Sequence, residues 1–193
     1  MATLDDHPDA QRWNRRYSPE DVAGSPSEVL SRNLHLLPPR GQALDLACGL
    51  GADAMLMARH GLDVEAWDIS ANAIFALERQ AESLSIQGVV RDAVAHPPAP
   101  EQFDVILVAR FLERSLSSHL MDALKPGGLL FYQTFSNLRI DDSGPTNPDF
   151  RLADNELLTL FAPLRIRVYR EEGGLGNTDQ GFRNQAMLIA QKA

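Results

Sequence analysis

The chain has 193 residues and a mass of 21.3 kDa, with 44% hydrophobic and 23% charged residues. This length and composition predict one globular domain and exclude a disordered chain, a collagen-like repeat and a membrane bundle. The 26 acidic and 18 basic residues give a net charge of -8, which disfavours DNA or RNA as a partner unless a local basic patch overrides the overall field.

The first half of the chain alternates helical patterns with short apolar runs. Residues 27–37 have apolar side chains at helical spacing, with Ser27 as a possible N-cap. Residues 43–47 form a short apolar run that predicts a buried strand. Ser70 stands at the start of a longer helical pattern that it can cap. We therefore expect helices at 27–37, at 52–60 and after Ser70, and strands at 43–47, 64–69 and 88–91.

The second half continues this alternation up to its last two strands. Residues 103–109 form a continuous, β-branched-rich run, typical of a strand covered on both faces. Two strands close the chain without a helix between them, so we expect them to pair as an antiparallel hairpin. The expected elements are a helix at 115–124 ended by Lys125-Pro126-Gly127-Gly128, a strand at 129–135, a polar loop at 136–150, a helix at 154–161 with an Asp cap, and strands at 164–170 and 186–191.

Strands that alternate with helices build a parallel sheet that is covered on both faces. The predicted fold class is therefore α/β, doubly wound, with a mostly parallel seven-stranded sheet, helices on both faces and a C-terminal antiparallel hairpin. One domain is expected over residues 1–193, with an N-terminal segment at 1–26 and the α/β core at 27–193.

The most informative segment is the glycine turn after the first expected strand, Leu44-Asp45-Leu46-Ala47-Cys48-Gly49-Leu50-Gly51. Glycine permits a sharp turn, and its missing side chain lets a ligand lie against the main chain. The N-terminus of the following helix offers free N–H groups to a carboxylate or a phosphate. Asp68 ends the next strand, where an acid can accept both hydroxyls of a ribose.

The glycine turn alone leaves the ligand open. Residues 49–54 also satisfy the dinucleotide pattern G-x-G-x-x-G/A, and a tight turn without any ligand is a further interpretation. Asp45 disfavours a dinucleotide as the ligand. A buried carboxylate is unfavourable unless another group pairs with it, and a pyrophosphate, which is itself negative, does not provide that partner. S-adenosylmethionine carries an ammonium, a sulfonium and a ribose diol but no phosphate, so it fits an acid at this position.

Further segments accompany the glycine turn: Asp68-Ile69-Ser70, Asp92, Phe103-Asp104-Val105-Ile106 and Leu124-Lys125-Pro126-Gly127-Gly128-Leu129-Leu130. With them, the chain from about Trp13 to its C-terminus resembles the class I S-adenosylmethionine-dependent methyltransferases. More narrowly, Trp13-x-x-Arg16-Tyr17 and the loop with Gly144-Pro145, Asn147-Pro148 and Phe150 look like the tellurite-resistance-type branch of small methyltransferases.

The resemblance implies a Rossmann-like methyltransferase fold and S-adenosylmethionine as the cofactor. It implies that the glycine turn holds the methionine end, Asp68 the ribose and Asp92 the adenine amino group. It also implies that Arg16 and Tyr17 close over the cofactor from the N-terminal segment. The complete implied set of cofactor-binding residues is Arg16, Tyr17, Asp45, Ala47, Gly49, Gly51, Asp68, Ile69, Asp92, Ala93, Ala109, Arg110 and Phe111.

The sequence offers no evident general base and no metal site, because its five histidines are scattered without metal-ligand spacing. Arg110 and Arg183 are candidates for contact with an anionic acceptor. The missing base favours a small acceptor that is soft or already anionic, such as a thiol, selenium or tellurium species. The alternatives are a nicotinamide-dependent oxidoreductase and a regulator that binds S-adenosylmethionine without catalysis.

The sequence also bears on location and partners. Cys48, the single cysteine, cannot form a disulfide within the chain. The polar, acidic N-terminus lacks the features of a signal peptide, and the apolar stretches are far shorter than the roughly 20 residues that span a bilayer. We expect a cytoplasmic protein that acts on a small molecule, without a nucleic acid or membrane partner, and the oligomeric state stays open.

Overall fold

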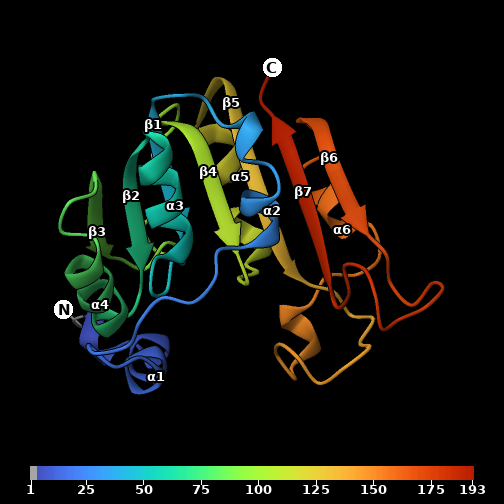
Figure 1. Ribbon diagram of the computed structural model, residues 1–193, viewed down its shortest axis with the longest axis horizontal. Helices are drawn as coiled ribbons and strands as arrows, with labels where there is room; N and C mark the ends of the chain where they lie inside the picture. The colour runs from blue at the N-terminus through green and yellow to red at the C-terminus, as the bar shows by residue number, and fades with distance from the viewer. Residues whose placement is uncertain (1–3) are drawn as a thin grey trace.

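A seven-stranded sheet with the strand order β3-β2-β1-β4-β5-β7-β6 forms the centre of the computed structural model, which describes residues 4–193 (Figure 1). Neighbouring strands from β3 to β5 are parallel, whereas β7 is antiparallel to both β5 and β6. The predicted fold class is confirmed, including the C-terminal antiparallel hairpin. The strands are β1 (Gln42–Leu46), β2 (Asp63–Asp68), β3 (Ile86–Val90), β4 (Phe103–Ala109), β5 (Leu124–Phe135), β6 (Arg165–Glu171) and β7 (Gln185–Gln191).

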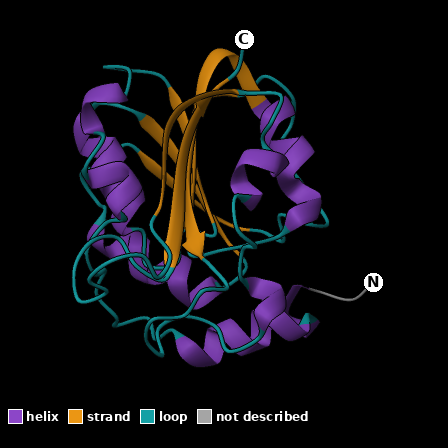
Figure 2. Ribbon diagram, turned by 90° about the vertical axis from the view of Figure 1, so that its right-hand side faces the viewer, coloured by secondary structure: helices purple, strands orange, loops and turns teal. Residues whose placement is uncertain are grey.

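Helices cover both faces of this sheet, as the edge-on view shows (Figure 2). Helices α2, α3 and α4 lie on one face, and α5 and α6 lie on the other. Helix α1 lies across the end of the molecule toward which the arrows of β2 and β4 point (Figure 1). None of the helices in residues 4–193 is long and apolar enough to cross a membrane. The helices are α1 (Pro8–Arg16), α2 (Glu28–Ser31), α3 (Ala52–His60), α4 (Ala71–Gln80), α5 (Ser117–Ala123) and α6 (Glu156–Leu160).

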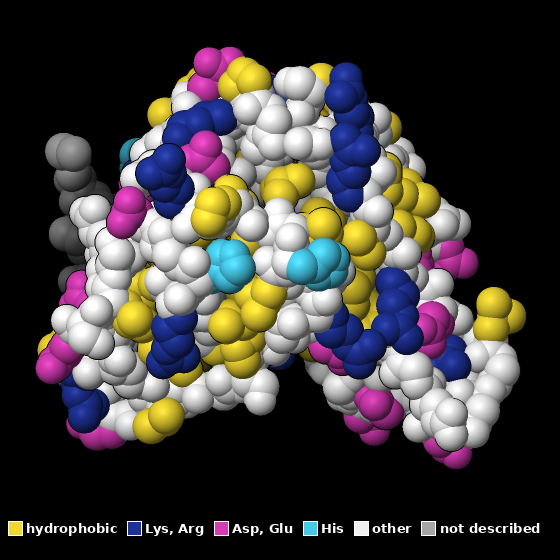
Figure 3. All heavy atoms as spheres, turned by 45° about the horizontal axis from the view of Figure 1, so that its top comes forward, with side chains coloured by type: hydrophobic (Ala, Val, Ile, Leu, Met, Phe, Trp, Pro, Cys, Tyr) yellow, Lys and Arg dark blue, Asp and Glu magenta, His cyan; other side chains and the backbone are white. Residues whose placement is uncertain are grey.

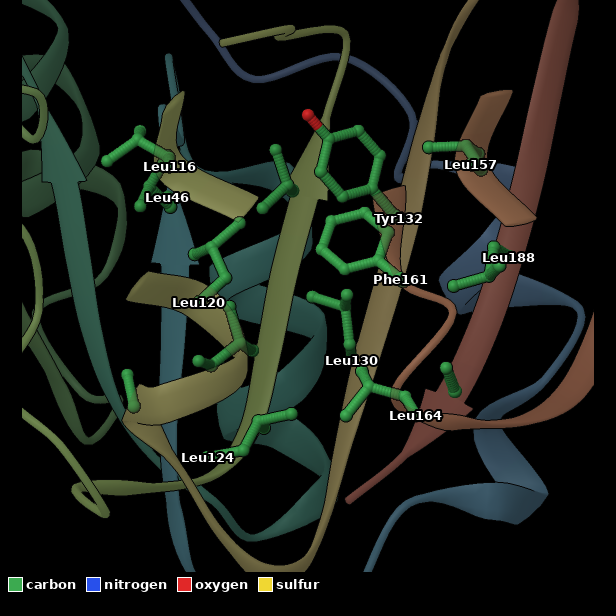
Figure 4. Packing of buried hydrophobic residues seen from close by; sticks show 14 of the residues in the cluster. Leu46, Leu116, Leu120, Leu124, Leu130, Tyr132, Leu157, Phe161, Leu164 and Leu188 are labelled. Atoms are coloured by element: carbon green, nitrogen blue, oxygen red, sulfur yellow. The ribbon is translucent and has the colours of Figure 1, made fainter. Parts of the chain in front are cut away.

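Two apolar layers, one on each face, hold the sheet. Leu44 of β1 belongs to the layer under α5 and α6, where the rings of Tyr132 and Phe161 pack with their centroids 5.4 Å apart (Figure 4). Ala43 belongs to the opposite layer under α2 and α3. Because successive side chains of a strand point to opposite faces, Asp45 faces the same side as Ala43, toward α3. This alternation places a carboxyl group beneath the glycine turn.

The helix predicted at 27–37 is wrong in length. Helix α2 ends at Ser31, and a short 3-10 turn follows at Leu34–Leu36. The side-chain Nδ2 of Asn33 donates to the carbonyl of Val29 at 3.0 Å, which takes the acceptor that the backbone N–H of residue 33 would use in a continuing helix. Ser27 occupies the N-cap position, but its hydroxyl donates to Asp53 instead of capping α2.

Two later boundaries also differ from the predictions. Lys125–Gly128, expected as a turn, belongs to β5, which begins at Leu124 and shifts its register against β4 before Leu129. Helix α6 is shorter than expected and starts after Asn155, whose φ of 60° lies in the left-handed region, rather than after an Asp cap. Its first turn is held by Glu156, whose side chain accepts from the N–H of Ala153 at 2.7 Å. The helix predicted at 115–124 is present as a 3-10 turn at Arg114–Leu116 and α5.

Candidate functional site

The candidate site lies at the carboxyl ends of β1, β2 and β4, where the strand order reverses between β1 and β4. Such a switch point is where open α/β sheets bind ligands. The glycine turn follows β1 here, with φ values of 57° at Ala47, 52° at Gly49 and 76° at Gly51. A Cβ on Gly51 would lie 2.2 Å from a methyl carbon of Leu77, so this position requires glycine. The left-handed alanine is the kind of strain that collects at binding sites.

Asp68 joins the glycine turn to the end of β2. Its Oδ2 accepts from the N–H of Gly49 at 2.8 Å, and its Oδ1 accepts from the N–H of Ser70 at 2.9 Å. Burial raises the pKa of this carboxyl, while these backbone hydrogen bonds lower it. The side chain is 8% exposed. Because each carboxylate oxygen can accept more than one hydrogen bond, a fixed Asp68 keeps acceptor capacity for a ligand.

Two further carboxyl groups lie under the turn. Asp45 is 2% exposed, and its Oδ2 accepts from the N–H of Ala54 at 2.9 Å. Asp53, in the first turn of α3, is 7% exposed, and its Oδ1 accepts from both the N–H and the hydroxyl of Ser27 at 2.8 and 2.9 Å. Burial raises the pKa of both carboxyls, and the charge of Asp53 raises that of Asp45 further. No Lys, Arg or His within residues 4–193 forms an ion pair with Asp45, Asp53 or Asp68.

The N-terminal helix covers the turn through polar contacts to α4. The side-chain Nδ2 of Asn72 donates to the carbonyls of Asn14 and Tyr17 at 2.8 and 3.0 Å. Ser70 caps α4 as predicted, and its hydroxyl also donates to Oδ1 of Asn14 at 2.7 Å. These contacts place the Tyr17 hydroxyl beside Gly49, where a Cβ would lie 2.9 Å from the hydroxyl oxygen.

Tyr17 and Arg16 differ in their position relative to the glycine turn. Burial and the charge of Asp68 raise the pKa of Tyr17, whose hydroxyl therefore lies within electrostatic range of Asp68. Its ring stacks on Trp13 with the centroids 5.7 Å apart. Arg16 is exposed, and its guanidinium lies 5.9 Å from the centre of the Trp13 ring. The structure thus brings Tyr17 to the predicted site and leaves Arg16 at its outer rim.

Arg110, directly after β4, adds a positive charge to the site. Its φ is 57°, and its N–H donates to the carbonyl of Gln133 at 2.8 Å, which fixes this left-handed residue against β5. The charge of Arg110 lowers the pKa values of Asp53 and Tyr17, so the guanidinium lies within electrostatic range of both side chains. Its side chain has no hydrogen bond to another residue in the described part of the chain. Phe111 follows, and its carbonyl accepts from the Tyr132 hydroxyl at 3.0 Å.

Asp92 lies on the other side of β2, after β3. Its Oδ1 accepts from the N–H groups of Val94 and Ala95 at 2.9 and 3.2 Å, and its Oδ2 lies 3.8 Å from Nε2 of His7. A hollow of about 800 Å³ is lined by Asp92 and His7 together with Leu4, Asp6, Pro8, Val89, Val90, Arg91, Ala95 and His96. No residue of the glycine turn lines this hollow. Asp92 is the residue that the hollow shares with the predicted site. Ile69 and Ala93 are half-buried near these strand ends.

Arg183 is engaged within its own loop between β6 and β7. Its guanidinium donates to the carbonyls of Gln180, Gly173 and Asn177 at 2.6, 2.8 and 3.0 Å. It also lies 3.8 Å from the carboxylate of Glu172. These contacts hold the loop at 172–183 together, and none of them is made with a residue of the glycine turn. Its predicted contact with the acceptor therefore gains no support from its hydrogen bonds.

The loop at 136–150, opposite α1, is held by a buried arginine. Arg151 donates from Nε to the carbonyl of Pro145 at 2.7 Å and from Nη1 to that of Ser136 at 2.8 Å, and its Nη2 donates to the carbonyl of Ser143. Asn184 adds a second anchor, because its Oδ1 accepts from the N–H of Ile140 at 2.6 Å. The space-filling view shows the lower edge of the molecule hollowed between two lobes (Figure 3).

Sequence reasoning missed several residues of this arrangement: Asp53, Asn72 and Gln133. Asp53 had a signal, since a second acid four residues after Gly49 adds charge to a turn that already holds Asp45. The other two act across long sequence separations. The side-chain oxygen of Gln133, for example, accepts from the N–H of Val29 at 2.7 Å. No local pattern marks such contacts.

Comparison with known proteins agrees with this geometry. Residues 43–128 match the family model described as a methyltransferase domain. A ubiquinone biosynthesis O-methyltransferase of Albidiferax ferrireducens is 34% identical over 113 residues, which cover 53% of this chain and 44% of that protein. The chain spans a third to about half of the length of the curated relatives it matches.

Solved structures share the fold over most of the chain. A SAM-dependent methyltransferase of Methanosarcina mazei has a TM-score of 0.66 and 20% identity, covering 88% of this chain and 99% of that one. TehB of Haemophilus influenzae has a TM-score of 0.69 and 24% identity, covering 95% of this chain and 67% of that one. At 20% and 24% identity, these likenesses show the fold of the chain.

Proposed function

We propose that the chain, which is similar to methyltransferases in sequence and fold, is a class I S-adenosylmethionine-dependent methyltransferase that binds S-adenosylmethionine at the glycine turn and methylates a small acceptor. The observation that carries this proposal is the group of buried carboxyls, Asp45, Asp53 and Asp68, which no side chain of residues 4–193 pairs by a salt bridge. Buried charge of one sign needs a partner, and a ligand with an ammonium and a sulfonium group provides it.

The residues present fit this cofactor. Asp68 has the free acceptor capacity that a ribose diol needs, and Asp92, after β3, is our candidate to accept from the adenine amino group. Gly49 and Gly51 keep the turn free of side chains, so that the methionine end can lie against the main chain. The cofactor supplies a methyl group that its positive sulfur already activates. The work of the protein is then alignment, worth as much as roughly 7–11 kcal/mol in well-oriented systems.

The acceptor side favours a small acceptor that is anionic or soft. The charge of Arg110 acts on Asp53 and Tyr17, and its side chain makes no hydrogen bond within residues 4–193. A thiol, selenium or tellurium species would not need a general base at neutral pH. The net charge of -8 disfavours a nucleic acid acceptor.

The two alternative functions make different demands. A nicotinamide dinucleotide would bring its pyrophosphate to a turn already crowded with Asp45 and Asp53, which repel it. A regulator without catalysis would bind S-adenosylmethionine equally well, so turnover distinguishes it from an enzyme.

Calorimetry with S-adenosylmethionine, S-adenosylhomocysteine and NADH tests the proposal. We expect both adenosyl ligands to bind in the micromolar to millimolar range typical of substrates, and NADH to give no heat of binding. NADH binding without adenosyl binding would overturn the proposal. Methyl transfer to a panel of thiols, selenite and tellurite then tests the acceptor. Binding of the cofactor without transfer to any acceptor on the panel would favour the regulator.

A matched pair of variants locates the site. Asp68→Asn removes the charge at the end of β2 and should weaken S-adenosylhomocysteine binding at least about tenfold, since hydrogen bonds to charged groups contribute roughly 1.5–3 kcal/mol. Asp63→Asn makes the same change at the exposed start of the same strand and should leave binding unchanged. Equal binding by both variants would place the ribose elsewhere.

A further inference from the structure

The imidazole of His7 makes contacts through both of its ring nitrogens. Nδ1 accepts from the N–H of Asp9 at 3.2 Å at the start of α1, and Nε2 lies 3.8 Å from Oδ2 of Asp92. Because Nδ1 is an acceptor, the neutral ring carries its proton on Nε2, on the side of Asp92. Both His7 and Asp92 line the hollow at the end of β3. His7 therefore connects the first turn of α1 to the carboxyl that is our candidate for the adenine amino group.

The contact between His7 and Asp92 depends on charge. A separation of 3.8 Å is too long for a hydrogen bond, so the neutral ring gains little from it, whereas the carboxylate attracts a protonated ring at this distance. The carboxyl is fixed through Oδ1, which accepts from the N–H groups of Val94 and Ala95, while Oδ2 accepts no hydrogen bond from residues 4–193. Oδ2 is therefore the oxygen that remains for a ligand donor, and it is also the oxygen that His7 faces.

Protonation also changes the contact on the other side of the ring. A charged imidazole has a proton on both nitrogens, so Nδ1 can no longer accept from the N–H of Asp9, and this cap of α1 is lost. Histidine is the side chain whose charge ordinarily changes between about pH 5 and pH 8. The neutral ring thus favours the cap, and the charged ring favours Asp92.

Other charged groups lie around His7, and two of them are engaged elsewhere. The carboxylate of Asp9 lies 3.8 Å from Nη1 of Arg12. The guanidinium of Arg91 lies 3.9 Å from the centre of the Trp67 ring. These contacts direct Asp9 and Arg91 to other partners, while Asp92 keeps its contact with the imidazole. The charged or titratable groups around His7, on its own segment and around the hollow, are Asp6, Asp9, Arg91, Asp92 and His96.

We propose that His7 is a pH-dependent latch on the hollow, an inference that rests on the proposed function. The neutral ring caps α1 and leaves Oδ2 of Asp92 to the cofactor. The protonated ring pairs with Asp92 and competes with the adenine amino group for that oxygen. Cofactor uptake therefore weakens in mildly acidic solution through His7, in addition to the effect of the buried acids at the glycine turn.

The test measures binding of S-adenosylhomocysteine by calorimetry at about pH 7.5 and about pH 5.5, within the range in which histidine changes its charge. His7→Asn keeps a side-chain oxygen that can cap α1 but carries no charge at either pH. The loss of affinity from the higher to the lower pH should be about two- to fivefold larger in the wild type than in His7→Asn, as expected for a partly exposed ion pair. His96→Gln is the control, because it removes a histidine that lines the same hollow, and it should keep the wild-type pH response.

A second measurement uses the protein without ligand. The NMR signals of the His7 ring should differ between the wild type and Asp92→Asn more at the lower pH than at the higher pH, because the carboxylate attracts the charged ring most strongly. The exposed His35 serves as the control, and its signals should not respond to Asp92→Asn at either pH.

The outcomes separate the latch from the proposed function. A wild-type protein that binds no S-adenosylhomocysteine at either pH overturns the function itself, and the NMR comparison then still decides whether protonated His7 pairs with Asp92. Equal pH responses of the wild type and His7→Asn overturn the latch alone. His7 signals that ignore Asp92→Asn at the lower pH also overturn it, and so does a His96→Gln variant that loses the same pH response as His7→Asn.

Discussion

Two regions flank the glycine turn, and they are attached in different ways. Helix α1 buries a single residue, Ala10, and is held on α4 largely by the amide of Asn72. The loop at 136–150 is held by the buried guanidinium of Arg151, which donates to backbone carbonyls at three points along it. Arg114 adds a further clamp to the same loop through the carbonyl of Asp149 at 2.6 Å.

The difference in attachment indicates that the two regions differ in how easily they open. Segments with few buried contacts open at low free-energy cost, whereas segments held by buried polar networks open with the whole fold. We expect α1 to lift away so that the cofactor can enter, and we expect the loop at 136–150 to stay in place as a fixed wall of the acceptor side.

The largest expected effect tests whether Arg151 holds the loop at 136–150 in place. Arg151→Met leaves the carbonyls of Ser136, Ser143 and Pro145 without their buried donor, so the free energy of unfolding should fall by about 3 kcal/mol or more. Urea unfolding measures it. Arg139→Met, in the same loop, removes a surface pair with Asp142 and should change stability by less than about 1 kcal/mol. Similar effects of the two variants would show that the buried clamp does not hold the loop.

The next effect tests whether α1 opens separately from the rest of the fold. Asn72→Ala removes the donor to the carbonyls of Asn14 and Tyr17, so opening of α1 should become easier by about 1–2 kcal/mol. Amide hydrogen exchange in α1 should accelerate accordingly, while exchange in β4 stays slow. Asn147→Ala removes a cap in the opposite loop and serves as the control. Faster exchange throughout the sheet in Asn72→Ala would contradict a separate motion of α1.

A smaller effect is expected from the hydroxyl that α1 brings to the turn. Tyr17→Phe removes it from its place beside Gly49 and should weaken S-adenosylhomocysteine binding by roughly 0.5–1.5 kcal/mol, with stability nearly unchanged. Tyr169→Phe, whose hydroxyl meets Glu171 on the edge strand β6, should leave binding unchanged. Calorimetry distinguishes the two, and an unaffected Tyr17→Phe would remove Tyr17 from the binding surface.

The smallest effect is a difference in pH response between the two regions. Burial raises the pKa values of Asp45, Asp53 and Asp68, so the folded state retains their protons to higher pH than the unfolded state does. Their contribution to stability is present below the ordinary aspartate pKa of about 3.9 and is lost as pH rises through the raised values. Binding of a cationic ligand has the opposite trend and should strengthen over the same rise in pH.

Two carboxyls in the opposite region, Asp141 of the loop at 136–150 and Glu156 of α6, titrate in the reverse sense. Arg114 lowers the pKa of Glu156, and hydrogen bonds from Ser143 lower that of Asp141. Their stabilisation is present above the ordinary carboxyl pKa and is lost as pH falls through the lowered values. Urea unfolding of the ligand-free protein and calorimetry, both across pH 4 to 8, check the two trends. Cofactor affinity that falls as pH rises would contradict the role of the three buried acids.

The parts of the site that the sequence predicted are those built from neighbouring residues. A strand, a glycine turn and a helix define where Asp45 and Gly51 must lie, and the end of the next strand defines Asp68. Helix 27–37 was predicted too long because its apolar spacing outweighed one amide, that of Asn33. The contacts of Asp53 with Ser27 and of Arg151 with Ser136 depend on which distant segments meet, and no spacing in the chain encodes this.

The position of β7 has a consequence for how the protein is assembled. This strand follows β6 in the chain but lies between β5 and β6, so β6 has no backbone partner until the final strand has been synthesised and inserted. The same insertion brings Gln185 to Gln133, whose amide donates to it at 2.7 Å. As a nascent polypeptide leaves the ribosome, the half of the sheet that carries the glycine turn can therefore form first, and the edge made by β7 and β6 is completed last.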